Sequence, residues 1–390
     1  MHSTLIVLLS SYTIAIALWI AHEMYLTNGV VKMAENGGNP KSEKKTVVTT
    51  ELRPQVSVVV CIRDGQVHLM NLLEALEQQK FERDWEVIMV DDGSTDDTWQ
   101  LLIDYQKSRS GAFALKIFQL KNTRSGKKQA LQFAIDQASG SALIFTDVDC
   151  VPSSDIWLHR LAEPLDQGQD LVLGVSLPLL DRSPGFVGAI QAWDALRIVR
   201  SYIGWAEKGR PYMGVGRNMA MRAEIHPGFE ANADLASGDD DLAIQRLLAT
   251  ESVATFSLIG RESQVDSVLP KTPQGWYRQK QRHWTTAPRY SMSDRLRLIF
   301  PQALSLICLV LGITALVKGL HDGVLHIALW IVGLGMGLAW LVAGLTFRSI
   351  AKACQTPDRW LHYGWLQPLG TGWMWMMAIT MAIVPSKRHW

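Results

Sequence analysis

Long apolar runs at both ends of the chain constrain its fold more than any other feature. The run from Leu5 to Ala21 contains no Asp, Glu, Lys or Arg and is close to the length that crosses a bilayer core. Similar stretches lie at 303–317 and 324–347, with a weaker one at 366–384. We predict an N-terminal transmembrane anchor in residues 1–27 and a C-terminal membrane region in residues 291–390 with two or three spanning helices.

Basic residues flank these stretches on one side of the predicted membrane. They are Lys32, Lys41, Lys44, Lys45, Arg53, Arg295, Arg297, Arg348, Lys352 and Arg359. Because cytoplasmic flanks carry an excess of Lys and Arg, we expect the segment between the spans to be cytoplasmic. Lys387 and Arg388 fit only if 366–384 does not cross or if this tail is an exception. Pro368 leaves a kinked, re-entrant or interfacial helix open there.

Composition excludes several classes of function. Lys and Arg number 38 and Asp and Glu number 37, so no overall positive field attracts nucleic acid, and no nucleic-acid partner is expected. The four cysteines are far apart and follow neither zinc-site nor disulfide spacing. This distribution of cysteines is typical of a domain in a reducing compartment. The sequence does not define the oligomeric state.

The segment between the membrane regions predicts an α/β domain. Residues 28–54 have the composition of a polar linker, and residues 55–290 alternate apolar runs with helical patterns. The expected strands are Val56–Cys61, Trp85–Val90, Leu115–Leu120 and Ala142–Thr146, and the expected helices are Leu69–Gln79, Asp97–Lys107 and Gly126–Ser139. This alternation predicts a doubly wound, mostly parallel sheet with helices on both faces.

Charged residues follow three of the predicted strands, at the sheet edge where ligands bind in such folds. Arg63 follows the first strand, Asp91 and Asp92 the second, and Asp147 and Asp149 the fourth. Two acids one residue apart suit Mg²⁺ or Mn²⁺, which completes its shell with substrate phosphates. A solvated turn would also place acids there. Asp91 and Asp92 could accept a hydrogen bond from a nucleobase.

Seven segments in order resemble the family 2 inverting glycosyltransferases, which have the GT-A fold. They are VSVVVCIRD, VDDGSTDDT, RSGKKQAL, TDVDC, GVGRNMAMR, SGDDDL and RQKQRHW, and the likeness runs from about Pro54 to Arg289. The resemblance is to membrane-anchored bacterial members, which implies a protein of the bacterial inner membrane active in cell-envelope glycan synthesis.

The resemblance implies a role for most of the candidate residues. Asp91 would hold the nucleobase, beside Asp92 and Arg63, and Lys127 would lie near the base or the phosphates. Asp147 and Asp149 would lie beneath the sugar and diphosphate, with Asp149 the more direct metal ligand. SGDDDL aligns Asp239 with the catalytic base, although Gly238 replaces the usual Glu and leaves Asp240 as the alternative.

RQKQRHW resembles the family's Q-x-x-R-W motif, with His283 inserted before the tryptophan. Gln279 and Arg282 match the motif; Arg282 could brace the diphosphate and Trp284 could form part of the acceptor surface. A basic interfacial helix beside the membrane is an equal and compatible interpretation.

We therefore predict a metal-dependent, inverting transferase that moves a sugar from a nucleoside diphosphate, such as a UDP-sugar, to a membrane lipid or lipid-linked glycan. A processive polysaccharide synthase is the alternative. A non-catalytic membrane subunit that binds nucleotide sugars is a rival of another class, supported only by the loss of Glu at Gly238. A nucleotidyltransferase is disfavoured, because CIRDGQVHL has a single glycine after the first strand.

Overall fold

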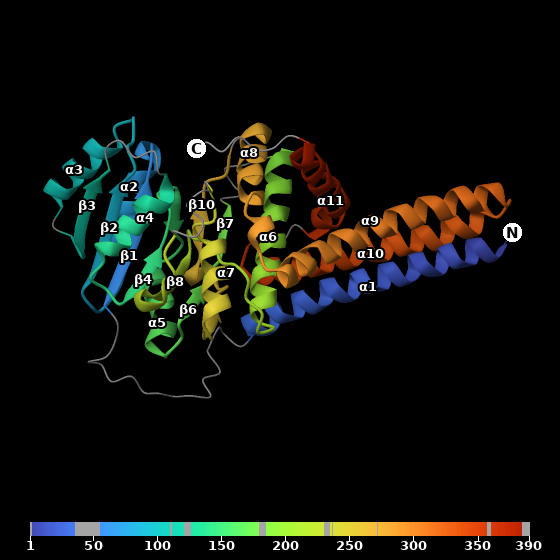
Figure 1. The fold of residues 1–390 in the computed structure, drawn as a ribbon, viewed down its shortest axis with the longest axis horizontal. Helices are drawn as coiled ribbons and strands as arrows, with labels where there is room; N and C mark the ends of the chain where they lie inside the picture. Colours follow the sequence, from blue (N-terminus) through green and yellow to red (C-terminus); the bar gives the residue numbers. More distant parts are fainter. Residues whose placement is uncertain are drawn as a thin grey trace.

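The chain folds into an α/β unit at one end and a bundle of long helices at the other (Figure 1). The structure is a computed structural model. It describes residues 2–35, 55–109, 111–120, 126–178, 185–229, 235, 237–270, 272–356 and 360–383. The predicted flanking charges at 41, 44, 45, 53, 359, 387 and 388 lie outside these ranges.

Three helices form the bundle and run side by side away from the α/β unit (Figure 1). They are α1 (His2–Glu35), α9 (Met292–His321) and α10 (Leu325–Ala353). All three are long and apolar enough to cross a membrane, and they coincide with the predicted anchor and the first two predicted C-terminal spans. Tyr12 of α1 fits between glycines of the other two helices, and its hydroxyl donates to the Val332 carbonyl over 2.9 Å.

The last helix, α11 (Trp360–Ile383), packs outside the bundle. It contacts α10 and also α6 (Gly185–Ala206) of the α/β unit. Its Trp373 stacks on Trp276 of α8 (Pro273–Trp284), with ring centroids 5.2 Å apart. Among the described residues, α11 is not one of the helices that meet the length and hydropathy of a span.

The predicted polar linker begins later than residue 28, because α1 continues to Glu35. Val30 and Met33 are buried in the core of the α/β unit. At Gly29 the helix approaches α6 so closely that an added Cβ would lie 3.2 Å from the Gly204 carbonyl oxygen. Tertiary packing therefore extends the helix through a polar sequence, and residues 36–54 lie outside the described part.

The main sheet has seven strands in the order β3-β2-β1-β4-β8-β6-β9. Their bounds are Ala114–Gln119, Trp85–Asp91, Val56–Ile62, Ala142–Phe145, Met219–Arg222, Leu171–Leu173 and Thr255–Ser257 in that order. The four strands expected from the sequence are present and parallel. The sheet is mixed rather than uniformly parallel, because β8 runs antiparallel to both β4 and β6.

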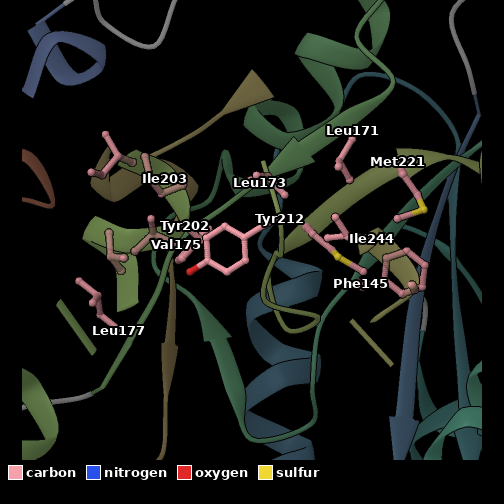
Figure 2. Packing of buried hydrophobic residues seen from close by; sticks show 14 of the residues in the cluster. Phe145, Leu171, Leu173, Val175, Leu177, Tyr202, Ile203, Tyr212, Met221 and Ile244 are labelled. Carbon is pink, nitrogen blue, oxygen red and sulfur yellow. The ribbon is translucent and has the colours of Figure 1, made fainter. Parts of the chain in front are cut away.

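Helices cover both faces of the sheet, as the alternating pattern predicts. Val58 and Val60 of β1 face one core with α2 (Gln66–Glu77), α3 (Thr98–Ser108) and α5 (Trp157–Asp166). Val59 faces the other core with α4 (Lys127–Asp136), α6 and α7 (Asp241–Thr250). Figure 2 shows part of this second core, which contains Tyr202 of α6 together with residues of β4, β6, β8 and α7. Two-residue periodicity thus divides each strand between two cores.

A small second sheet connects the main sheet to the helices near the membrane. It consists of β5 (Cys150–Pro152), β10 (Val265–Ser267) and β7 (Ser176–Pro178) in that order. Short 3₁₀ turns at Ala223–Ile225, Arg261–Ser263 and Ala287–Arg289 join neighbouring elements. Asn218 fixes this junction, because its amide donates to the carbonyls of Val175 and Ser263 and accepts from Trp157 Nε1 over 3.0 Å.

Candidate active site

A lysine joins two of the predicted acidic segments. Lys127 begins α4 at the edge of the sheet where β1, β2 and β4 end. Its Nζ lies 2.9 Å from an Asp147 oxygen and 2.8 Å from an Asp239 oxygen. The structure therefore brings the predicted base and the D-x-D segment to one ammonium group.

Opposite charges in contact determine the protonation states of Lys127 and Asp239. Burial opposes the charge of Lys127, but Asp147 and Asp239 outweigh it and raise the lysine pKa well above its usual value. Burial likewise opposes the ionisation of Asp239, yet Lys127 holds the pKa of Asp239 below its ordinary range. Asp239 is thus a carboxylate at neutral pH and can accept a proton.

Asp147 and Asp149 form the predicted metal-binding pair. Burial, and then the charge of Asp147, raise the pKa of Asp149. Burial opposes the charge of Arg217, but the nearby Asp147 and Asp149 carboxylates raise the pKa of Arg217 above its usual value. Two partly buried carboxylates that repel each other suit a divalent cation. Among the described residues no group of three or more His, Cys, Asp or Glu could hold a metal, so phosphate oxygens would have to complete its shell.

The three consecutive acids of SGDDDL have different surroundings. Asp240 caps α7 and accepts from the backbone N–H groups of Gly216 and Asp241, over 2.9 and 2.8 Å. Burial and the neighbouring acids raise the pKa of Asp240 to about 7. Asp241 accepts from the hydroxyls of Thr286 and Tyr290, each over 2.6 Å. Asp240 therefore holds the backbone at Gly216, and Asp241 holds the segment that follows α8, while Asp239 contacts the lysine that also pairs with the D-x-D segment.

Gly238 has a backbone conformation that favours glycine. Its φ is +92°, in the left-handed region, and an added Cβ would lie 2.6 Å from Leu242 Cδ1. A side chain here would clash with the first turn of α7. The backbone at position 238 thus suits glycine and would be strained with any other residue.

The residues predicted to hold the nucleobase lie at the same edge. Asp91 is fully buried at the end of β2, where it accepts from Ser94 N over 3.1 Å and from Gln119 Nε2 over 3.0 Å. Asp92 is also buried, and its carboxylate lies 3.9 Å from the partly exposed Arg63 guanidinium. Asp91 therefore orders the VDDGSTDDT turn, with Arg63 at its rim.

The α8 segment lies between these acids and the membrane helices. Gln279, His283 and Trp284 line a cavity of about 410 Å³ that Asp240 and Arg217 also line. Arg282 lies in the last turn of α8. Lys280 pairs with the buried Asp194 of α6. Both predictions for this segment are compatible with the structure, because α8 borders the acidic site and also packs on α11.

Sequence reasoning gave no role to three charged residues of this region. Arg217 belongs to GVGRNMAMR, a segment that stands out only through the family resemblance. Asp194 lies on α6, and Lys280 lies between the matched positions Gln279 and Arg282. The available signal for Asp194 was an acid among the mostly apolar residues of this helix, three residues before Arg197.

Comparison with known proteins identifies the domain. Residues 57–221 match Glycosyl transferase family 2. The chain carries a family 2 glycosyltransferase domain. The match contains Asp91, Lys127, Asp147, Asp149 and Arg217, and it ends before Asp239.

Curated relatives of this glycosyltransferase domain match over shorter segments. A glycosyltransferase of Haloferax volcanii is 29% identical over 127 residues, which is 32% of this chain and 40% of that protein. A GalNAc(5)-diNAcBac-PP-undecaprenol beta-1,3-glucosyltransferase of Campylobacter jejuni is 33% identical over 96 residues, which is 25% of this chain and 30% of that protein. The chain thus spans well under half the length of these relatives.

A solved structure shows the fold over nearly the whole chain. A mannosyltransferase from Pyrobaculum calidifontis, in complex with GDP-Man and Mn2+, superposes with a TM-score of 0.55 at 17% identity. The superposition covers 92% of this chain and 99% of that one. The glycosyltransferase domain therefore has the mixed α/β, GT-A type of fold predicted from the sequence.

Proposed function

We propose that the protein is an inverting glycosyltransferase that transfers a sugar from a nucleoside diphosphate, such as a UDP-sugar, to a membrane lipid or lipid-linked glycan. The observation that carries this proposal is the position of Lys127 between Asp239 and Asp147. It brings a basic carboxylate beside the acids suited to the diphosphate. A non-catalytic subunit has no need of both groups at one site.

Asp239 would act as the catalytic base. The acceptor hydroxyl must lose its proton as its oxygen attacks the anomeric carbon, and a carboxylate in hydrogen-bond reach can take that proton. A single displacement with the base opposite the leaving diphosphate inverts the configuration. Lys127 keeps Asp239 ionised and oriented, and Arg217 supplies a fixed positive charge beside the D-x-D acids.

The remaining predicted residues would bind the donor. Asp91, Asp92 and Arg63 would surround the nucleobase at the ends of β1 and β2. Asp147 and Asp149 would hold Mg²⁺ or Mn²⁺ together with the diphosphate, and the metal would neutralise charge on the leaving group. The solved mannosyltransferase that shares the fold is named with GDP-Man and Mn2+, which supports this choice of ligand class.

A membrane-associated acceptor is supported by the way the domain is attached. Glu23 of α1 is 1% exposed and pairs with Arg200 of α6, so the domain is fixed to the bundle by a buried ion pair. The Campylobacter relative's name contains a lipid-linked glycan. Arg295, Arg297, Arg348 and Lys352 lie at the domain end of α9 and α10, which supports a cytoplasmic site.

Turnover of nucleotide sugars by the purified protein tests the proposal. With Mn²⁺ and membrane lipid extract, we expect transfer from at least one of a panel of radiolabelled donors, and EDTA should stop it. Asp239→Asn should lower the rate by about 10²-fold to 10⁴-fold while nucleotide binding persists. Asp104→Asn, at an exposed position on α3, is the matched control. Donor binding without turnover across the panel would favour a non-catalytic subunit.

A further inference from the structure

An exposed acid after the first strand has an unusual backbone conformation. Asp64 lies between β1 and α2, next to the predicted nucleobase residue Arg63. Its φ is +50°, in the left-handed region that few residues other than glycine adopt, although Asp and Asn tolerate it better than most. A residue held in this region often belongs to a functional site, because surrounding contacts must stabilise it there. The contacts of Asp64 therefore indicate which parts of the site its loop holds together.

Asp64 connects its own loop to the VDDGSTDDT turn that follows β2. Its backbone N–H donates to Ser94 Oγ over 2.9 Å. Its Oδ1 accepts from both the N–H and the hydroxyl of Thr95, over 2.7 and 3.0 Å. One residue thus makes three hydrogen bonds to a loop that follows another strand, and these bonds fix the two loops relative to each other.

The next two residues of the chain extend this connection. The Gly65 N–H donates to Thr98 Oγ1 over 2.9 Å, and the Gln66 N–H donates to Asp96 Oδ2 over 3.1 Å. Gly65 and Thr98 are buried, whereas Asp64 is exposed. Removing the Asp64 carboxylate therefore leaves the buried part of the connection in place, so the domain should still fold.

The connected loops carry the residues predicted to hold the nucleobase. Arg63 and Asp92 approach each other from the two loops, with Arg63 Nη1 3.9 Å from Asp92 Oδ2. Ser94, which accepts from Asp64, also donates its own N–H to Asp91 Oδ1 over 3.1 Å. A shift of one loop against the other would move Arg63 relative to Asp91 and Asp92 and so change the space between them.

The same loop also touches the segment predicted to bind the metal. An added Cβ at Gly65 would lie 3.0 Å from Val148 Cγ2, so the backbone after Asp64 packs directly against the residue between Asp147 and Asp149. The loop of Asp64 thus lies between the nucleobase residues on one side and the D-x-D acids on the other. Its position sets the separation of the two ends of the predicted donor site.

We propose that Asp64 is a positioning residue for the nucleobase of the donor. Its hydrogen bonds to Ser94 and Thr95 hold the nucleobase residues at a fixed separation from the D-x-D acids before the donor binds. A nucleoside diphosphate then binds without the entropic cost of ordering these loops. Asp64 itself takes no part in sugar transfer. The inference rests on the proposed nucleotide-sugar donor, but nucleotide binding can be measured without the reaction.

Two substitutions separate the side chain of Asp64 from its backbone. Asp64→Gly keeps the left-handed backbone at no steric cost and removes the carboxylate. Asp64→Asn keeps an oxygen that can accept from Thr95, and Asn also tolerates the left-handed backbone. Asp84→Gly is the matched control, because it makes the same change at an exposed loop position at the opposite end of β2.

Isothermal titration calorimetry of the full chain in detergent measures the binding of UDP, GDP and inorganic diphosphate, each with Mn²⁺. For the nucleotide that the wild type binds more tightly, Asp64→Gly should raise the Kd about tenfold, as expected for the loss of two hydrogen bonds. Asp64→Asn and Asp84→Gly should stay within about twofold of the wild type. The Kd of inorganic diphosphate, which has no base, should be the same in all four proteins. In transfer assays, Asp64→Gly should raise the donor KM and leave kcat nearly unchanged.

The inference would be overturned if Asp64→Gly bound the nucleotide as the wild type does, or if it lost affinity for the nucleotide and for diphosphate equally. Equal losses in Asp64→Asn and Asp64→Gly would also overturn it, because a hydrogen-bond acceptor would then not be enough. If the variants follow the expected pattern but the wild type transfers no sugar, only the proposed reaction fails. If the wild type transfers sugar and Asp64→Gly keeps its donor KM, only the positioning role fails. Both fail if the wild type binds neither nucleotide.

Discussion

The buried acid Asp194 is expected to control the stability of the junction between α6 and α8. Burial alone would raise the pKa of Asp194, but the charges of Lys280 and Arg197 outweigh it and lower the pKa to about 2. Replacing Asp194 by Asn keeps the size of the side chain and removes the charge. The two cations then face each other without a counter-ion in a largely buried site.

The pKa shift sets the size of the effect. Relative to an ordinary Asp, the lowered pKa corresponds to about 2 kcal/mol of stability at pH 7. Leaving the cations unpaired adds to this, so we expect Asp194→Asn to lower the free energy of unfolding by about 2–4 kcal/mol. A depressed pKa contributes stability above the ordinary Asp pKa and loses it as pH falls toward 2. About half of the contribution linked to the pKa should remain at pH 3.

Urea unfolding of the detergent-purified chain, followed by tryptophan fluorescence at pH 7 and pH 3, measures both quantities. The exposed Asp104 on α3 provides the control, because Asp104→Asn should change stability by no more than about 0.5 kcal/mol. The reasoning would be refuted if Asp194→Asn had no larger effect than the control. A loss that was the same at both pH values would refute the electrostatic part.

Two further changes test local geometry. Gly238→Ala should destabilise the chain by about 2 kcal/mol or more in the same urea assay, since the left-handed backbone and the contact with Leu242 both oppose a Cβ. Gly260→Ala, where an added Cβ meets no atom within 4 Å, should change little, and equal losses at the two glycines would contradict this account. Asn218→Ala removes three buried hydrogen bonds and should cost about 3 kcal/mol; a loss below about 1 kcal/mol would show that the junction does not depend on them.

Local sequence patterns were sufficient for most of the secondary structure. The strand at Val56–Ile62 and the helix at Gln66–Glu77 follow from apolar periodicity, which depends only on near neighbours. The antiparallel direction of β8 was not predictable in this way, since strand direction depends on where the preceding helix returns the chain. The end of α1 also lies beyond the predicted end of the anchor at residue 27. Residues 28–35 are polar in part, but packing on α6 keeps them helical.

The sequence by itself determined the apolar spans, the alternating α/β pattern and the acids at the strand ends, because each is written in adjacent residues. Only the tertiary structure decided which contacts each of the consecutive acids at 239–241 makes. Asp239, Asp240 and Asp241 are equivalent in the sequence, yet Lys127, the Gly216 amide and Tyr290 approach them from separate elements. The cavity beside α8 arises in the same way, because its charged and apolar walls come from helices distant in the chain. Packing brings those partners together, and no pattern of neighbouring residues in the sequence predicts these contacts.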